Sequence, residues 1–128
     1  MSSNMWGDIE NIKEVETPTS ILEDQGRILS EATKFRILGL VETKKGYSIE
    51  MGNDVIISSL NVEVPKLNNY SYDVLRIEYT IDIYPLFLYD YVNDTDVTVT
   101  NEEDFKKELT RVLSSNKMKQ VLTTLISL

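Results

Sequence analysis

Histidine and cysteine, the side chains that most often act as bases, nucleophiles and zinc ligands, are both absent from this 128-residue sequence. A hydrolytic triad or a zinc site is therefore excluded. The five glycines are scattered singly, so the sequence also lacks the glycine-rich loop that cradles phosphates in nucleotide-binding proteins. A glycosidase-type carboxylate pair can be drawn from the 21 acidic residues, but no spacing favours one pair over another. We expect a protein that is not an enzyme and that binds no cofactor.

Three aspartates lie close enough in the sequence to raise the question of a calcium site. Asp90, Asp94 and Asp96 offer carboxylate oxygens, but an EF-hand loop also needs a glycine at its sixth position. The sixth residue is Thr95 when counted from Asp90, and Val99 when counted from Asp94. The pattern fails in both cases. We interpret residues 93–96 as a turn, because Asn and Asp are favoured in turns, and we predict no metal site.

Aromatic residues gather next to these aspartates. Six of the seven tyrosines fall between Tyr70 and Tyr91, around Pro85. Aromatic surfaces that stack nucleobases need nearby lysine or arginine to hold the phosphates, and Arg76 is the single base in residues 70–104. We therefore expect no direct binding to nucleic acid. An acidic surface can imitate a phosphate backbone, but such mimics usually carry denser negative charge than this chain.

The formal charge of −8 is distributed unevenly along the chain. Residues 70–104 contain nine acids and one base, net −8, whereas residues 105–128 contain one acid and five bases, net +4. An acidic field favours basic partner surfaces and repels nucleic acid. A general role of the acids in solubility is the alternative explanation.

Residues 1–16 are polar and acidic, yet they hold apolar side chains about three positions apart, which is a weak helical pattern. These apolar residues are Met5, Trp6, Ile9, Ile12 and Val15. We predict an N-terminal arm that is either docked on the domain or flexible until it folds against something else.

A helix is predicted from Pro18 to Thr33, because proline is favoured at the first helical position and Thr17 precedes it. Ser20 and Glu23 offer a second possible start as a capping box. Gly26 inside the helix costs about 1 kcal/mol relative to alanine. The expected buried face consists of Ile21, Leu22, Ile28, Leu29 and Ala32, with Gln25 among them.

The middle of the chain has the patterns of β-strands. Residues 35–51 predict a hairpin that turns at Lys44, Lys45 and Gly46, and residues 53–64 predict a strand that Pro65 ends. Residues 75–83 then alternate apolar and polar side chains, which predicts one long antiparallel strand.

The alternation breaks at Pro85, and two registers are open beyond it. The residues that face the core are Phe87, Tyr89 and Tyr91 if the strand continues, or Tyr84, Leu86 and Leu88 if a bulge or turn intervenes. In either register the other face carries apolar side chains. The chain's own helices or a partner must cover that face.

Two helices are predicted in the C-terminal third. The first begins at the N-cap Thr100 with Glu103 three residues later, and the second restarts from Ser115. The expected fold is α+β in one domain, residues 17–128: an N-terminal helix, an antiparallel meander of about four to five strands, and two C-terminal helices packed on one face. No apolar run reaches the length of a membrane span and no signal peptide pattern is present, so we expect a cytoplasmic protein.

By elimination of catalytic groups, we expect a non-enzymatic acidic module that docks on a larger, basic protein as an inhibitor, an immunity or anti-defence factor or an accessory subunit. A composition rich in Ile, Asn, Lys and Asp is typical of AT-rich genomes and favours a bacterial or phage origin. Aromatic residues ringed by acids form a plausible binding hot spot. The predicted partner-binding residues are Trp6, Tyr84, Leu86, Leu88, Tyr89, Asp90, Tyr91, Asp94 and Asp96.

Two alternatives remain open. The first is a small-molecule-binding module with a tyrosine-lined pocket between sheet and helices. The second is that the same residues close a homodimer, because an uncovered apolar sheet face is often buried by a second copy.

Overall fold

The structure, a computed structural model, describes residues 2–128, so the first residue of the predicted arm lies outside the described residues. Its elements are α1 (Pro18–Ala32), β1 (Leu38–Ser48), β2 (Asn53–Val64), β3 (Tyr70–Tyr79), β4 (Leu86–Asp90), β5 (Thr95–Val99), α2 (Glu102–Leu113) and α3 (Asn116–Ser127), with 3-10 turns at Ile9–Asn11 and Pro65–Leu67. The strands form one antiparallel sheet in the order β1-β2-β3-β4-β5. The predicted α+β meander is confirmed.

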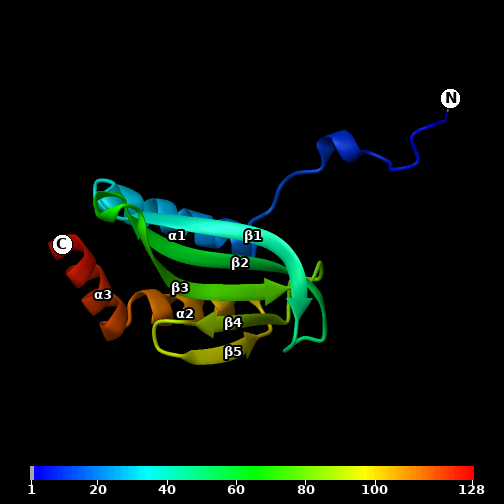
Figure 1. The fold of residues 1–128 in the computed structure, drawn as a ribbon. Helices are drawn as coiled ribbons and strands as arrows, with labels where there is room; N and C mark the ends of the chain where they lie inside the picture. The colour runs from blue at the N-terminus through cyan, green and yellow to red at the C-terminus, as the bar shows by residue number, and fades with distance from the viewer. Residues whose placement is uncertain (1) are drawn as a thin grey trace.

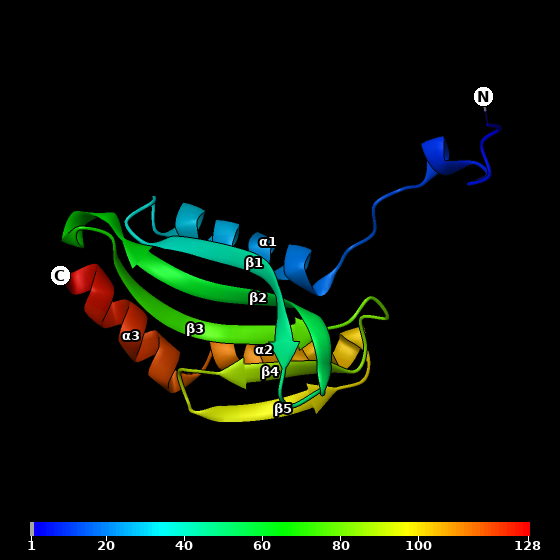
Figure 2. The same ribbon diagram turned by 45° about the vertical axis from the view of Figure 1, so that its right-hand side comes forward.

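All three helices of the domain lie on the same side of the sheet (Figures 1 and 2). We call this side the covered face and the opposite side the open face. α1 packs on β1 and β2, and α2 approaches β5. The main core lies between the helices and the covered face, and its largest fully buried side chains include Leu22, Ile77, Leu88 and Phe105.

α1 begins where the sequence predicts, because Thr17 caps it. The Thr17 hydroxyl accepts a hydrogen bond from the Ser20 backbone N–H, and the Ser20 hydroxyl accepts one from the Thr17 backbone N–H. The predicted buried face is partly wrong, since Ile28 is 53% exposed and Gly26 is buried instead. The cause is a close approach to β1: a Cβ at Gly26 would lie 2.6 Å from the Gly39 carbonyl oxygen.

The β1–β2 hairpin turns later than predicted. β1 runs through Lys44, Lys45 and Gly46, and the turn occupies residues 49–52, where Gly52 has a φ of +69°. Gly46 serves packing within the strand instead, because a Cβ there would lie 2.6 Å from Cδ1 of Ile57. The predicted end of β2 at Pro65 is confirmed.

The predicted long strand is wrong beyond Tyr79, where β3 ends. Residues 80–85 form the connection that reverses the chain, and Ile81 in it is 91% exposed. This connection changes the phase of the alternation. Leu86 and Leu88 in β4 therefore face the core, as the second of the two registers predicts.

The two C-terminal helices are confirmed, with one correction at a helix start. Asn101, one residue after the predicted Thr100, is the N-cap of α2 and accepts a hydrogen bond from the Asp104 backbone N–H at 2.8 Å. Ser115 caps α3 as predicted. Among residues 2–128, no helix combines the length and the apolar character that crossing a membrane requires.

Candidate functional site

Three of the predicted partner-binding residues lie inside the protein. Leu86, Leu88 and Asp90 are each 0% exposed, because the connection at residues 80–85 turns them toward α2. The expectation that they contact a partner is corrected: in the folded chain they belong to the covered face.

Asp90 has a structural role in the turn between β4 and β5. Its Oδ1 accepts hydrogen bonds from the backbone N–H groups of Val92 at 2.9 Å and Asn93 at 3.0 Å. Its Oδ2 accepts one from Nδ2 of Asn93 at 2.8 Å and lies 3.7 Å from Nη1 of Arg111. The turn is thus present at residues 91–94, two residues earlier than the predicted 93–96, because Thr95 and Asp96 already belong to β5, and the buried Asp90 carboxylate holds it together.

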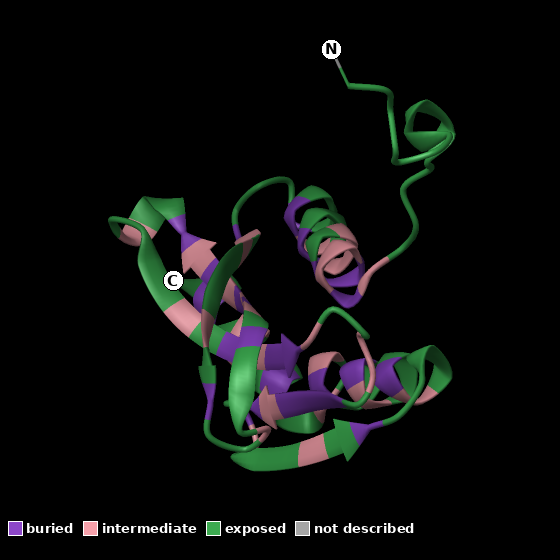
Figure 3. Ribbon diagram, turned by 90° about the vertical axis from the view of Figure 1, so that its right-hand side faces the viewer, coloured by how far each residue is buried: buried purple, intermediate pink, exposed green. Residues whose placement is uncertain are grey.

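Trp6 and Tyr84 lie apart from the other predicted residues. Trp6 is 81% exposed in the arm, which projects away from the domain beyond the start of α1 (Figure 3). Tyr84 is half-buried against the core, and burial together with the nearby Glu102 carboxylate raises the pKa of its phenol. Neither residue joins the remaining group.

That remaining group does come together, on the open face of β3 and β4. The rings of Tyr89 and Tyr91 lie 4.9 Å apart at an interplanar angle of 59°. The guanidinium carbon of Arg76 lies 5.2 Å from the centre of the Tyr89 ring and 5.7 Å from that of Tyr91, within the range of a cation–π interaction. We call Arg76, Glu78, Tyr89, Tyr91 and Asp94 the Arg76 cluster.

Strand register positions this cluster. Arg76 stands directly opposite Tyr89 across the β3–β4 ladder, and the Tyr91 backbone N–H donates to the Val74 carbonyl at 2.9 Å, which keeps the chain beside β3. The Arg76 guanidinium donates from Nε to Glu78 Oε2 and from Nη1 to the Tyr91 hydroxyl, both at 2.6 Å. Burial lowers the pKa of Arg76, but the hydrogen bonds to Glu78 and Tyr91 outweigh it, and the net shift is upward.

Glu78 is the unusual member of the cluster. It is only 3% exposed on a face that no helix covers, and its Oε1 atom has no hydrogen-bond partner in the described part of the chain. Buried charges are normally paired. Among the described residues, the ion pair with Arg76 is the contact that neutralises the Glu78 carboxylate. Arg76 is therefore held in place by a buried anion beneath it.

Asp94 closes the cluster on its outer side. The Tyr89 hydroxyl donates to Asp94 Oδ1, and this hydrogen bond raises the pKa of the Tyr89 phenol. Asp94 has a φ of 54°, a turn conformation that aspartate tolerates better than most residues. Asp94 in this turn thus also acts as the hydrogen-bond acceptor for the Tyr89 hydroxyl.

Sequence reasoning did not select Arg76 and Glu78 as site residues. A signal for them existed: Arg76 is the single base in the acidic stretch 70–104, and Glu78 follows it two positions later on the same strand face. Arg76 also belongs to a row of directly opposite residues that crosses all five strands on the open face. The row consists of Glu42, Ser59, Arg76, Tyr89 and Asp96.

The Arg76 cluster offers a contact surface whose side chains are already held in position. Its aromatic rings and guanidinium can stack on or hydrogen-bond to a partner with little further ordering. Within residues 2–128, no group of three or more acidic side chains is arranged to hold a metal ion.

Two tyrosines do line a cavity between sheet and helix, although they are not those of the cluster. Tyr70 and Tyr72 from β3 border a hollow of about 360 Å³ against Lys117, Val121 and Leu125 of α3.

Comparison with known protein families, with curated proteins and with solved structures finds no match to this chain.

Proposed function

We propose that this chain is a non-enzymatic, cytoplasmic protein-binding module of bacterial or phage origin, and that the open face of its sheet docks on a larger, basic protein. Such docking suits one of three roles: an inhibitor, an immunity or anti-defence factor, or an accessory subunit. The observation that carries the proposal is the Arg76 cluster, because tyrosine and arginine are the residues most enriched among binding hot spots.

Charge on the open face favours a basic partner. Acidic side chains outnumber basic ones around the cluster: the acids are Glu42, Asp73, Asp94 and Asp96, and the accompanying base is Lys44. All five of these side chains are exposed. Complementary charge steers association and suppresses wrong partners.

Order within the cluster favours tight binding. Tyr89 is tied to Asp94, Tyr91 to Arg76, and Arg76 to the buried Glu78. Side chains that are fixed before binding lose less conformational entropy in the complex. In the proposed interface, the Arg76 cluster thus forms the ordered centre and the exposed acids form the polar rim.

The test is capture of a partner by tagged full-length protein at low and high salt, with variants of the open face. Tyr89→Ala should weaken the complex by about 30-fold if it removes a hot spot of about 2 kcal/mol, and Asp94→Lys should weaken it most at low salt. Matched controls lie elsewhere: Tyr70→Ala, another exposed tyrosine, and Glu31→Lys on α1. A complex that survives both open-face variants, or that is lost equally in the controls, contradicts the proposal.

A second candidate function rests on the hollow lined by Tyr70 and Tyr72, which fits a small-molecule-binding module. A ligand present at a hundred times its dissociation constant should add about 2.7 kcal/mol to the stability of the fold. Melting temperatures measured against a panel of metabolites and nucleotides therefore test it, with Tyr72→Ala as the variant that should abolish any shift. No shift across the panel rejects this candidate and leaves the docking proposal untouched.

A further inference from the structure

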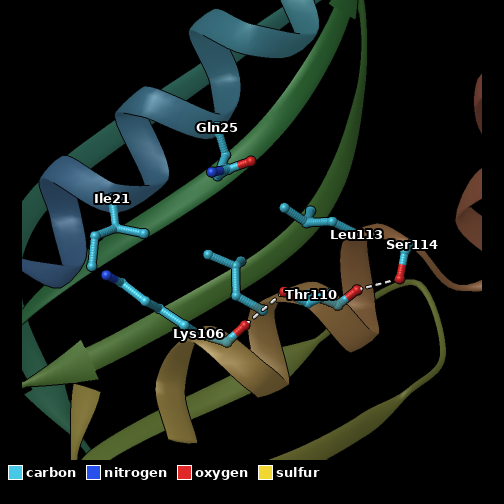
Figure 4. A pocket seen from close by; sticks show the side chains of 7 residues that line it. Ile21, Gln25, Lys106, Thr110, Leu113 and Ser114 are labelled. Atoms are coloured by element: carbon cyan, nitrogen blue, oxygen red, sulfur yellow. Dashed lines mark hydrogen bonds between the residues drawn. The ribbon is translucent and has the colours of Figure 1, made fainter. Parts of the chain in front are cut away.

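A groove separates α1 from α2 and α3 on the covered face. It consists of two adjoining cavities of about 400 and 240 Å³, which share Gln25 of α1 and Leu113 of α2. Figure 4 shows Ile21 and Gln25 pointing from α1 across this gap toward Lys106 and Leu113. Ile28 and Leu122 extend the apolar lining. This interhelical groove is open, although it lies directly above the core.

The N-terminal arm, residues 2–16, is polar overall but carries apolar side chains that stay largely exposed instead of packing on the domain. Its side chains Met5, Trp6, Ile12 and Val15 are between 73% and 88% exposed. The side-chain hydrogen bonds of residues 2–15 stay within the arm, in the part of the chain that the structure describes. Exposed apolar side chains at helical spacing are typical of a segment that folds onto a partner's groove.

Apolar character and length match the arm to the groove. Among the residues that line the groove, Lys106 is the one charged side chain, and it is already paired with Glu16 at 3.0 Å and Glu102 at 3.6 Å, so the match rests on apolar contact and not on charge. Fifteen residues in a helix span about 22 Å, the length of both α1 and a helical arm. The apolar side of a helical arm therefore fits this apolar groove.

The root of the arm directs it away from its own groove. Glu16 forms an ion pair with Lys106 at 3.0 Å, and the Thr17 cap fixes an extended backbone before Pro18. From this point the arm runs away from the domain in both views (Figures 1 and 2). Entry into its own groove would require a reversal at the capped residue, so a groove on a neighbouring molecule is the accessible one.

We propose that the chain forms a two-fold dimer in which each N-terminal arm folds as a helix into the interhelical groove of the second copy. Reciprocal exchange satisfies both arms and both grooves and closes the assembly at two chains. This inference goes beyond the proposed function, because it uses the covered face and leaves the open face free.

Trp6 makes the proposal directly measurable, since it is the single tryptophan of the chain. With increasing concentration of full-length protein, sedimentation should show the mass rising from 14.7 kDa to twice that value. Tryptophan emission should shift to shorter wavelength with the same midpoint, because Trp6 enters an apolar site. A monomer with unshifted emission at every concentration overturns the proposal, and shifted emission without a change in mass overturns the exchange between copies.

Point variants locate the contact. Trp6→Ala on the arm and Ile28→Glu in the groove should each weaken association at least tenfold. The matched control is Ile81→Glu, a 91% exposed isoleucine in the connection between β3 and β4, which should leave association unchanged. Asp94→Lys should also leave it unchanged, so failure of the dimer and failure of the open-face proposal are distinguishable.

Mixing the two defective variants gives the sharpest result. Trp6→Ala keeps an intact groove and is silent in tryptophan fluorescence, whereas Ile28→Glu keeps an intact arm with its tryptophan. Each alone should remain monomeric, but their mixture should form a heterodimer and shift the tryptophan emission to shorter wavelength. A mixture that behaves as the sum of two monomers rejects exchange of the arm.

Discussion

The two faces of this sheet are built from the same strands but differ in what their side chains contact. On the covered face, Ile77, Leu86 and Leu88 meet the helices and are each 0% exposed. On the open face, no helix excludes water, and the strands present a guanidinium, two tyrosine rings and carboxylates joined by hydrogen bonds. One alternating pattern therefore places apolar packing on one side of the sheet and an ordered polar cluster on the other.

Leu88 and Tyr89, which are adjacent in β4, should differ most in their contribution to stability. Leu88→Ala should lower the free energy of unfolding by about 2–5 kcal/mol, because it leaves a cavity in the main core. Tyr89→Ala on the opposite face should cost about 1 kcal/mol or less, since only cross-strand contacts are lost. Urea unfolding measures both. Equal losses would show that the open face contributes to the core as much as the covered face does.

A second prediction tests how closely α1 sits on the covered face. Gly26→Ala should destabilise the protein by about 1–3 kcal/mol despite the better helix propensity of alanine, because the new Cβ would lie 2.6 Å from the Gly39 carbonyl oxygen. Glu31→Ala on the exposed side of the same helix should change stability by less than about 0.5 kcal/mol. Thermal unfolding of the pair suffices. A stabilised Gly26→Ala variant would mean that α1 is free to move outward.

The third prediction concerns the charge buried under the open face. Arg76→Met should cost about 1–3 kcal/mol, because Glu78 then remains buried without its cation. Lys44→Met, which removes an exposed cation from the same face, is the control and should be nearly neutral. Adding Glu78→Gln to Arg76→Met should recover part of the loss, and strict additivity in this double-mutant cycle would contradict the coupling.

The smallest effect is a pH dependence on the open face. The hydrogen bond to Asp94 raises the pKa of Tyr89 in the folded protein, so the folded state holds this proton more tightly than the unfolded state. The stabilisation is therefore present below the ordinary tyrosine pKa of about 10 and is lost as the pH rises through the folded-state pKa. Stability of the wild type should exceed that of Tyr89→Phe at neutral pH, and the difference should vanish in alkali. Tyr70→Phe is the control.

Local patterns predicted the elements well. Thr17 and Pro18 marked the start of α1, Pro65 the end of β2 and Ser115 the start of α3, because capping and proline effects act over a few residues. The failures depend on contacts between distant segments. Gly26 is buried because β1 approaches it closely at Gly39. β3 ends at Tyr79 because the next residues form the connection to the antiparallel strand β4.

The candidate site was half predictable for the same reason. Tyr89, Tyr91 and Asp94 were selected from composition alone, and they do meet. Arg76 joins them only through the register of β3 with β4, which one sequence does not specify. Asp90 was selected for its charge, but its neighbours in the turn place it in the interior as a hydrogen-bond acceptor.

The meander order has a consequence for how the chain folds. Each strand pairs with its neighbour in the sequence, so the sheet can form through short connections without any long crossover. The interhelical groove is the exception, because Gln25 and Leu113 lie far apart in the sequence. During synthesis on the ribosome, α1 and the sheet can assemble before the second wall of the groove has emerged. The groove is therefore complete only after α2 and α3 have emerged, and in the proposed exchange an arm can bind only from that point on.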